Sequence, residues 1–475
     1  MDTGALDAVL DILDRDKTVY IERLRQAVAI DSVSNDPERY PRCLEMAEYL
    51  KANLEQLSMK VQFRSDTAEV KGPKDTTVPV PPIILASFDA DPAKKTLCAY
   101  GHYDVMPAAM SEGWSRDPFL LAEVDGELHG RGASDDKGPV MSWISVVEAH
   151  QKAGRQLPVN LKFIFEGREE AGSDGLEALV KRECESNGFF SDVDYIVISD
   201  SGSLGSKHCL TYGLRGVTEY EVAVSGPADN LHSGLYGGAV REPMHDLMKV
   251  LSSLTDASGS ISIPELQKLV RPVTEEEARR YSSIEFDPDQ WIESSSLPGV
   301  LGEKSKENIL MRRWRYPALS IHGIHASSAY KATCIPARCV ARFSIRTVPD
   351  MTAAAVDKVV SEHLQEQFAK LQSVNTLEVM PDYGGDWFLG DVSDENYSAA
   401  RRAHKRIRGE DPDLIREGGS IPIAISFSKV TKKSVCLLPI CGGTDNIHGP
   451  NEKMLKSNLF NGMKVMAAYL HELSL

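Results

Sequence analysis

Five places in this sequence carry side chains of the kinds that bind divalent cations. They are His102 with Asp104, Asp135 with Asp136, Glu169 with Glu170, Asp200, and His448. Carboxylates that gather in one pocket repel one another, and a divalent cation relieves that repulsion. Two imidazoles with several carboxylates suit zinc, manganese or cobalt better than calcium or magnesium. We therefore predict a site for one or two such cations, provided that the fold brings the five places together.

Three of these places come directly after short apolar runs. The runs and the polar residues that follow them are 96–100 before His102, 159–165 before Glu169, and 195–198 before Asp200. Runs of this kind are typical of central strands that are buried on both faces of a sheet. Residues 140–153 and 175–182 have helical character, and alternation of strands with helices predicts an α/β layer. Because ligands bind at the carboxyl ends of strands in such layers, we expect the polar residues to meet at that edge.

After residue 214 the pattern changes. Residues 217–224 and 338–346 alternate with the period of two that is typical of half-exposed strands, and 351–371 read as a long amphipathic helix. The α/β pattern then returns with an apolar run at 435–439 and a closing helix at 454–473. This order predicts one α/β domain that is interrupted by an inserted α+β unit.

The composition excludes several classes of partner. The chain has 475 residues, with 53 basic and 69 acidic side chains and a formal net charge of −16. An acidic surface repels phosphate backbones, so nucleic acid is not an expected partner. No apolar run reaches the roughly 20 residues that span a bilayer, and the acidic start does not resemble a signal peptide. The eight cysteines contain no C-x-x-C pair and read as free thiols in a reducing compartment. We predict a cytoplasmic protein with neither a membrane nor a nucleic-acid partner.

The candidate ligands lie in five motifs, GHYDVMP, GRGASDDKGP, FEGREEAGSDG, ISDSG and GGTDNIHGPNEK, in this order. Together these motifs resemble the dinuclear metallopeptidases of the M20 family. Further stretches resemble its cytosolic nonspecific dipeptidase and carnosinase branch: LTYGLRG, LHSGLYGG, RWRYPALSIHGI, FSIRTVP and REGGSIP. The resemblance implies an α/β fold, with a zinc-peptidase-like catalytic domain around a central mixed sheet, formed by residues 1–213 and 386–475. It also implies an inserted α+β lid domain over 214–385 that makes a homodimer.

The resemblance implies two divalent cations per subunit, zinc or manganese, with Asp135 bridging both. His102 and Asp200 would complete one cation site, and Glu170 and His448 would complete the other. The residues alone leave Asp136 as a competitor of Asp135, and the resemblance favours Asp135.

The resemblance also implies roles for residues around the cations. Glu169 would be the general base, and Asp104 would orient the imidazole of His102. His232 would reach in from the lid of the neighbouring subunit as a donor to the oxyanion. Three residues would hold the C-terminal carboxylate of the substrate, for which an arginine fork is well suited: Arg346, Thr333 and Ser420. Glu417 keeps two interpretations, contact with a substrate amine or a cap for a helix that begins near Ser420.

These roles describe a hydrolase. A water shared by two cations has a lowered pKa and becomes a hydroxide nucleophile near neutral pH. Glu169 can accept its proton and pass that proton to the leaving amine. We therefore predict carboxypeptidase-like hydrolysis of dipeptides, with Cys-Gly among the candidate substrates.

Two alternatives remain. The same two-metal scaffold could deacylate N-acyl amino acids or form an amide bond, because Ser201, Gly202 and Ser203 replace residues that include two aromatics in the family pattern. Asn446 and Ile447, beside His448, also depart from that pattern. A non-catalytic, metal-free scaffold is the second alternative, and the retention of every expected ligand argues against it.

Overall fold

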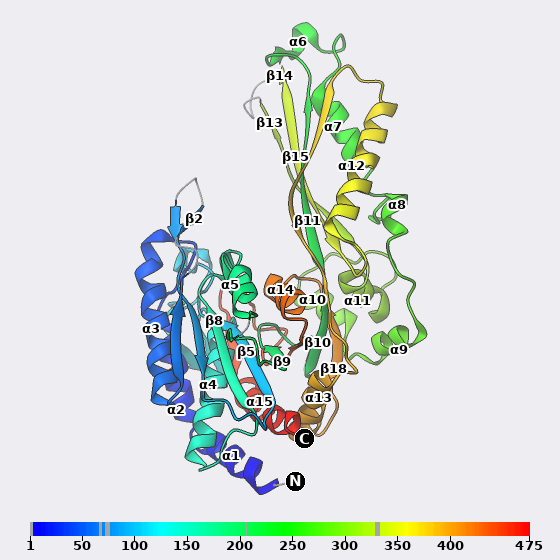
Figure 1. Ribbon diagram of the computed structural model, residues 1–475. Helices are drawn as coiled ribbons and strands as arrows, with labels where there is room; N and C mark the ends of the chain where they lie inside the picture. Colours follow the sequence, from blue (N-terminus) through cyan, green and yellow to red (C-terminus); the bar gives the residue numbers. More distant parts are fainter. Residues whose placement is uncertain (1–2, 66–68, 72–76, 186, 206, 328–332) are drawn as a thin grey trace. The chain divides into compact units, whose positions relative to one another are not determined.

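The computed structural model describes residues 3–65, 69–71, 77–185, 187–205, 207–327 and 333–475 (Figure 1). The chain forms two compact units. Unit 1 consists of Met1–Tyr212, Gly390–Ile415 and Pro422–Leu475, and unit 2 consists of Gly213–Leu389 and Arg416–Ile421. Within the described residues, no helix combines the length and the apolar character that are needed to cross a bilayer.

Unit 1 is built around a mixed sheet. The strands, in spatial order, are β1 (Lys60–Arg64), β4 (Ile83–Ser87), β8 (Asn160–Glu166), β5 (Thr96–His102), β9 (Tyr195–Ile198), β19 (Ser434–Leu437) and β10 (Cys209–Leu214). β8, β5, β9 and β19 run parallel to one another, whereas β1, β4 and β10 are antiparallel to their neighbours. The short strands β17 (Phe388–Leu389) and β18 (Asp413–Glu417) also pair with β10. The predicted α/β fold with a central mixed sheet is confirmed.

Helices cover both faces of the unit 1 sheet, which explains why the central strands are apolar along their whole length. In β5, Leu97 and Ala99 belong to the core formed with α1, α2, α4 and α15. Tyr100 points to the other face, where its ring lies 5.7 Å from that of Phe427 in α14. The helices of this unit are α1 (Thr3–Arg15), α2 (Lys17–Val28), α3 (Tyr40–Gln56), α4 (Lys137–Lys152), α5 (Leu176–Glu183), α13 (Glu395–Arg408), α14 (Pro422–Thr431) and α15 (Lys456–Leu473).

Smaller elements of unit 1 connect distant parts of the chain. β20 (Lys453–Leu455), β7 (Glu127–His129) and β6 (Ala122–Val124) form an antiparallel ribbon that joins the C-terminal part of the chain to the segment before α4. β2 (Glu69–Lys71) pairs with β3 (Thr77–Pro79). The short 3-10 helices are η1 (Pro37–Arg39), η3 (Met110–Glu112) and η4 (Glu169–Ala171).

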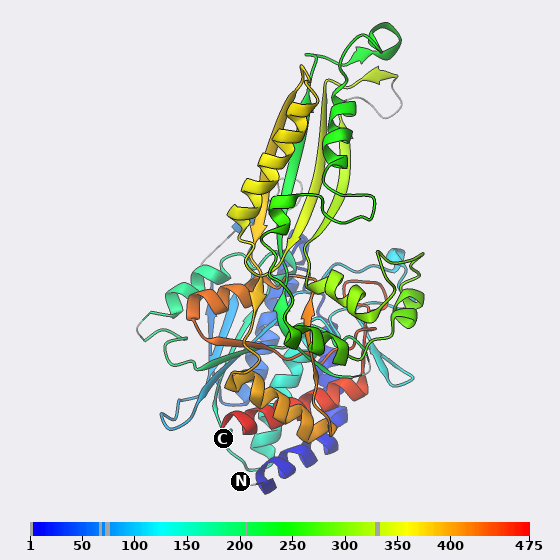
Figure 2. The same cartoon turned by 90° about the vertical axis from the view of Figure 1, so that its right-hand side faces the viewer.

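Unit 2 contains a four-stranded antiparallel sheet in the order β13 (Ala318–Ala326), β15 (Arg338–Thr347), β11 (Gly216–Ser225) and β16 (Thr376–Gly385). Two helices, α7 (Pro243–Ser252) and α12 (Ala353–Lys370), pack on this sheet (Figure 2). The alternation seen at 217–224 and 338–346 follows from this packing, because every second side chain of β11 and β15 faces the helices. The remaining elements are β12 (Leu231–His232), α6 (Ser233–Tyr236), α8 (Pro264–Gln267), α9 (Glu275–Ser283), α10 (Pro288–Ser294), α11 (Lys306–Trp314) and β14 (Cys334–Ile335).

Candidate metal centre

The sheet of unit 1 brings the candidate ligands to one edge. His102 is the last residue of β5, Asp200 comes two residues after β9, and Glu169 and Glu170 lie in η4 after β8. Because these three strands are parallel neighbours, their carboxyl ends meet, as the apolar runs predicted. Asp135 lies just before α4, and the loop between β19 and β20 supplies His448.

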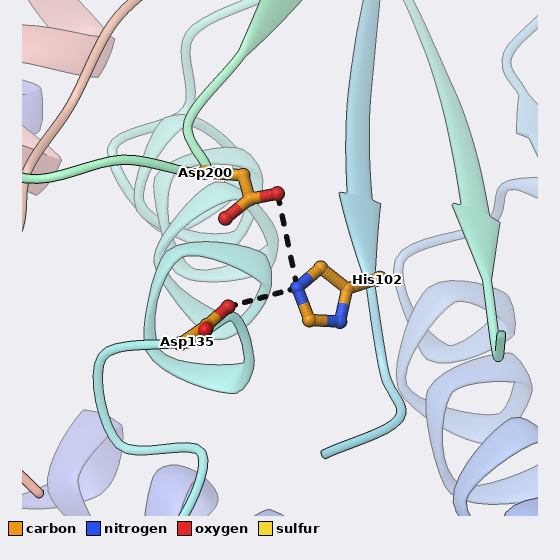
Figure 3. Close-up of side chains that lie close together, drawn as sticks. All are labelled: His102, Asp135 and Asp200. Atoms are coloured by element: carbon orange, nitrogen blue, oxygen red, sulfur yellow. Dashed lines mark hydrogen bonds and ion pairs between the residues drawn. The ribbon is translucent and has the colours of Figure 1, made fainter. Parts of the chain in front are cut away.

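The first cation group consists of His102, Asp135 and Asp200. The Nε2 atom of His102 lies 2.9 Å from Oδ1 of Asp135 and 3.8 Å from Oδ2 of Asp200. Figure 3 shows both carboxylates directed at this one ring nitrogen. The side chain of His102 is fully buried, and that of Asp200 is 15% exposed. These three side chains therefore enclose a position for a small cation.

The second cation group consists of Asp135, Glu170 and His448. The Nε2 atom of His448 lies 2.9 Å from Oδ2 of Asp135 and 3.0 Å from Oε2 of Glu170. Asp135 thus belongs to both groups, with one carboxylate oxygen facing each. Asp136, the competing ligand in the sequence, belongs to neither group, and its Oδ2 accepts a hydrogen bond from the backbone N–H of His102 at 3.1 Å.

Three carboxyl groups of this centre have raised pKa values. Burial, with the charges of Asp135 and Glu170, raises the pKa of Asp200 to about 7. Burial also raises the pKa of Glu170, and burial with the charge of Asp200 raises the pKa of Glu169 well above its usual range. In the described part of the chain, none of these carboxyl groups has an arginine or lysine as a hydrogen-bond partner.

The pKa values of the two imidazoles are also raised, which favours the charged form of each ring. Hydrogen bonds to Asp135 and Glu170 raise the pKa of His448 to about 10. Burial opposes charge on His102, but hydrogen bonds to Asp104 and Asp135 raise its pKa well above the usual value. The ring nitrogens thus lie within 3.0 Å of carboxylate oxygens in both groups. Two imidazoles and their carboxylates, held this close together, fit a pair of such cations.

Asp104 fixes the orientation of the residues around it. Its backbone carbonyl and Oδ1 lie 3.1 Å and 3.3 Å from Nδ1 of His102. Oδ1 also accepts the backbone N–H of Glu169 at 3.1 Å, and Oδ2 accepts that of Glu170 at 3.2 Å. Oδ2 further accepts the hydroxyl of Ser34 at 2.6 Å. One buried carboxylate therefore sets both the imidazole of His102 and the turn that carries the two glutamates.

Glu169 stands apart from both cation groups. It begins η4, directly after the loop that leaves β8, and its side chain is partly buried beside Asp200 and His102. A carboxyl group with a raised pKa next to a cation site has the character of a general acid and base. The position suits the proton transfer expected of this residue.

The candidate substrate residues lie in unit 2. Nη1 of Arg346, in β15, lies 3.1 Å from Oγ of Ser420, and that hydroxyl donates to the carbonyl of Arg215 at 2.6 Å. Burial raises the pKa of Glu417, and the charges of Arg313 and Arg215 act in the other direction. The structure thus places Arg346 and Ser420 together, with the guanidinium groups of Arg215 and Arg313 nearby.

His232 and Thr333 form a separate pair of neighbours in unit 2. The strand β12, which ends in His232, pairs with β14, which begins directly after Thr333. The side chain of His232 is exposed, and its Nδ1 accepts the N–H of Gly234 at 3.1 Å. The carbonyl of Thr333 accepts both the N–H and the hydroxyl of Ser233. All members of the two cation groups lie in unit 1.

Sequence reasoning assigned no role to Glu452, which is buried in the loop beside the second cation group. Its carboxylate accepts hydrogen bonds from the backbone N–H groups of Ser134 and Asp135. The signal in the sequence is weak, since one glutamate in a polar loop is most often solvated.

The chain is similar to known proteins over nearly its whole length. The model of peptidase family M20/M25/M40 matches residues 98–472. The chain is 43% identical to the Cys-Gly metallodipeptidase of Candida albicans over 473 residues, which cover 98% of this chain and 97% of the relative. It is 42% identical to the human Beta-Ala-His dipeptidase over 474 residues, 99% of this chain and 93% of the relative. The crystal structure of human carnosine dipeptidase 1 is similar, with a TM-score of 0.86 and 41% identity over 99% of this chain and 98% of that one.

Proposed function

Since this chain belongs to peptidase family M20/M25/M40, we propose that it is a metal-dependent dipeptidase that uses two divalent cations. The observation that carries this proposal is the pair of ligand groups that share Asp135. The relatives named above are dipeptidases, and no relative named above supports the acylase or amide-forming alternative. We propose dipeptides as the substrates, with Cys-Gly as the first to test.

The proposed cofactors are two zinc or manganese ions per subunit. His102, Asp135 and Asp200 would hold one ion, and Asp135, Glu170 and His448 the other. When bound, the ions would lower the pKa of a shared water and polarise the scissile carbonyl. The protein contributes ligands at fixed separations and, through Asp104, a fixed imidazole.

The other proposed roles are the transfer of protons and the binding of the substrate. Glu169 would accept the proton of the attacking water and transfer it to the leaving amine, which its raised pKa favours. Arg346 and Ser420, joined by a hydrogen bond, would bind the terminal carboxylate together with Thr333. His232, supplied by a second subunit, would donate to the oxyanion. A requirement for a free C-terminus follows from the arginine.

We propose a cytoplasmic homodimer in which residues 214–385 act as lid and dimerisation domain, and residues 1–213 and 386–475 as catalytic domain. The edge strand β13 supports this assembly. It ends the four-stranded sheet, and Ile321 and Ile324 on it are 46% and 42% exposed. An edge strand with exposed apolar side chains can pair with another chain. The exposed His232 would then be available to a neighbouring subunit.

The test is an activity screen on metal-free protein reconstituted separately with zinc and with manganese. We expect about two ions per chain by elemental analysis, and hydrolysis of Cys-Gly and other dipeptides but not of their C-terminal amides. N-acetyl amino acids serve as the comparison substrates. Failure to cleave any dipeptide with either metal bound would overturn the proposal, as would preferential cleavage of the N-acetyl compounds.

A further inference from the structure

Glu452 is a fully buried carboxylate that lies four residues after His448 and directly before β20. A buried carboxylate requires hydrogen-bond donors for both of its oxygens, since isolated burial of a charge is costly. The donors that Glu452 uses all come from one short segment of the chain, residues 131–135. That segment ends in Asp135, the residue common to both cation groups.

Four hydrogen bonds connect Glu452 to this segment. Oε2 accepts from Nη1 of Arg131 at 2.7 Å and from the backbone N–H of Gly132 at 3.0 Å. Oε1 accepts from the backbone N–H groups of Ser134 and Asp135 at 2.9 Å and 3.1 Å. Because three of the four donors are backbone groups, the carboxylate fixes the path of the main chain up to Asp135.

Further bonds bind the loop that carries His448 to the same segment. The guanidinium of Arg131 donates to the carbonyl of Gly449 at 3.2 Å. The hydroxyl of Ser134 makes contacts of 2.8 Å with Oδ2 of Asp445 and with the carbonyl of Lys453. The segment with Asp135 and the loop with His448 are therefore held as one body, and Glu452 is its most highly bonded member.

The two cation groups differ in how much they depend on this body. In the first group, His102 ends a buried central strand and Asp200 closely follows another. In the second group, His448 lies in a loop and its side chain is 53% exposed. This body thus supplies two ligands of the second group, Asp135 and His448, but one ligand of the first group, Asp135, whose other two ligands are placed by the sheet.

We propose that Glu452 is a positioning residue that holds Asp135 and His448 at the separation at which both can bind the cation of the second group. This inference rests on the proposed function, because it takes the two groups as cation sites. It adds a residue outside both groups and predicts that the two sites have unequal sensitivity to its loss. Partners that orient metal ligands commonly change metal affinity by about 10- to 100-fold.

The decisive variant is Glu452→Gln. An amide has the shape of the carboxylate but accepts at one oxygen alone, so its NH2 group would face two of the four donors. Isothermal titration of metal-free protein with Zn²⁺, with a competing chelator, should show two ions bound to wild type. We expect the variant to bind one ion with near wild-type affinity and the other about 10- to 100-fold more weakly.

The background variant His448→Ala assigns the weakened site. This variant lacks a ligand of the second group, so adding Glu452→Gln should change the affinity of the remaining ion by less than about threefold. A large further loss in that background would place the effect of Glu452 in the first group and overturn the inference. Equal affinities of wild type and Glu452→Gln for both ions would also overturn it.

Asp246→Asn is the matched control for loss of a buried, highly bonded carboxylate. Asp246 is buried in unit 2 and accepts from Nε of Arg241 at 2.6 Å and from Nδ2 of Asn375 at 2.8 Å. Its variant should lose thermal stability and still bind two ions with wild-type affinities. Weakened zinc binding by this control would show that destabilisation alone affects the metal sites, and would overturn the inference.

A milder variant covers the case in which Glu452→Gln does not fold. Ser134→Ala removes the hydroxyl contacts to Asp445 and Lys453 and leaves the Glu452 carboxylate in place. It should weaken the second ion by a smaller factor, and an unchanged affinity would count against the inference. If wild type itself bound fewer than two ions, the proposed function would fail, which is a separate outcome from equal binding by wild type and variant.

Discussion

Two buried clusters of charged side chains, one in each unit, avoid the cost of burial in opposite ways. In unit 2, Oε1 of Glu277 accepts hydrogen bonds from Arg315 and Arg416, each at 2.7 Å. Arg315 also donates to the carbonyl of Arg271 at 2.8 Å. In this cluster two guanidinium groups pair with one carboxylate, and the three side chains are between 5% and 11% exposed.

The cluster in unit 1 has an excess of carboxyl groups. The groups around Asp135 meet one another and two imidazoles, and the raised pKa values of Glu170 and Asp200 show that their charged forms are unfavourable there. A buried carboxylate that is paired with guanidinium groups can serve the fold alone, whereas a group of buried carboxylates without such partners calls for an external positive charge. We therefore expect changes in the cluster around Asp135 to act on metal content and turnover, and changes in the cluster around Glu277 to act on stability.

Asp135→Asn should have the largest effect. An amide cannot offer an anionic oxygen to each of two cations, so both groups would lose their shared ligand. We expect metal content to fall from about two ions to well below one, and kcat/KM to fall by about 10⁴-fold or more. Elemental analysis after gel filtration measures the metal content, and an assay with Cys-Gly measures kcat/KM.

Asp136→Asn, which changes the adjacent residue, is the matched control for Asp135→Asn. An asparagine oxygen can still accept the N–H of His102, so both ions should remain bound. The opposite result, loss of metal on changing Asp136 and its retention on changing Asp135, would assign the bridging role to Asp136.

Glu169→Gln should leave the metals in place and stop proton transfer. General acid–base groups contribute about 10²- to 10⁴-fold, so we expect kcat to fall by that range. For this variant, kcat and metal content are measured in parallel. Glu177→Gln, which changes an exposed glutamate of α5, is the control and should keep wild-type turnover. Near wild-type kcat in Glu169→Gln, or loss of its metals, would contradict the role of general base.

The sequence allowed the sheet edge of unit 1 to be predicted because its central strands are almost uniformly apolar. The runs at 96–100, 159–165 and 195–198 correspond to β5, β8 and β9, and few other structures bury such runs on both faces. His102, Glu170 and Asp200 lie at or just after the ends of these strands as expected from α/β architecture. The roles of individual ligands came from the family resemblance, since spacing alone did not separate Asp135 from Asp136.

Other features left little signal in the sequence. Glu452 lies 317 to 321 residues from its hydrogen-bond donors, and three of those donors are backbone groups that leave no trace in residue type. The helices α8–α11 of unit 2 are short, and α9 contains three glutamates and two arginines in nine residues. Its start is fixed by Thr274, whose hydroxyl accepts the N–H of Glu277. Such helices are specified by caps and tertiary contacts more than by apolar periodicity.

Glu277→Gln tests the buried cluster of unit 2, in which Glu277 pairs with Arg315 and Arg416. Removing one partner of a buried ion pair leaves uncompensated charge, here on Arg315 and Arg416, and typically costs about 3–5 kcal/mol. We expect a loss of unfolding free energy in that range, measured by urea titration that is followed by tryptophan fluorescence. The number of metal ions bound per chain should not change. Glu221→Gln breaks an exposed pair with Arg342 and should cost less than about 1 kcal/mol. A fall in bound metal with Glu277→Gln would contradict the separation of roles.

His404 represents a third way of burying an ionisable group, which is to remain neutral. It is 2% exposed, and neither ring nitrogen has a hydrogen-bond partner among the described residues. Burial, with the nearby His208 and Arg408, lowers the pKa of His404 to about 3. As the pH falls below the ordinary value of 6.5, the unfolded chain takes up a proton that the folded protein does not, so stability decreases from pH 6.5 towards pH 3.

The expected effect of this group is about 2 kcal/mol of unfolding free energy lost between pH 7 and pH 5. His404→Leu should lack that part of the decrease, whereas changing the exposed His245 to leucine should preserve it. The measurement compares urea titrations of metal-free proteins at the two pH values, so that release of cations does not contribute. Equal pH dependence of wild type and His404→Leu would mean that the folded protein protonates this imidazole readily. His404 would then not be an example of an ionisable group that is buried in its neutral form.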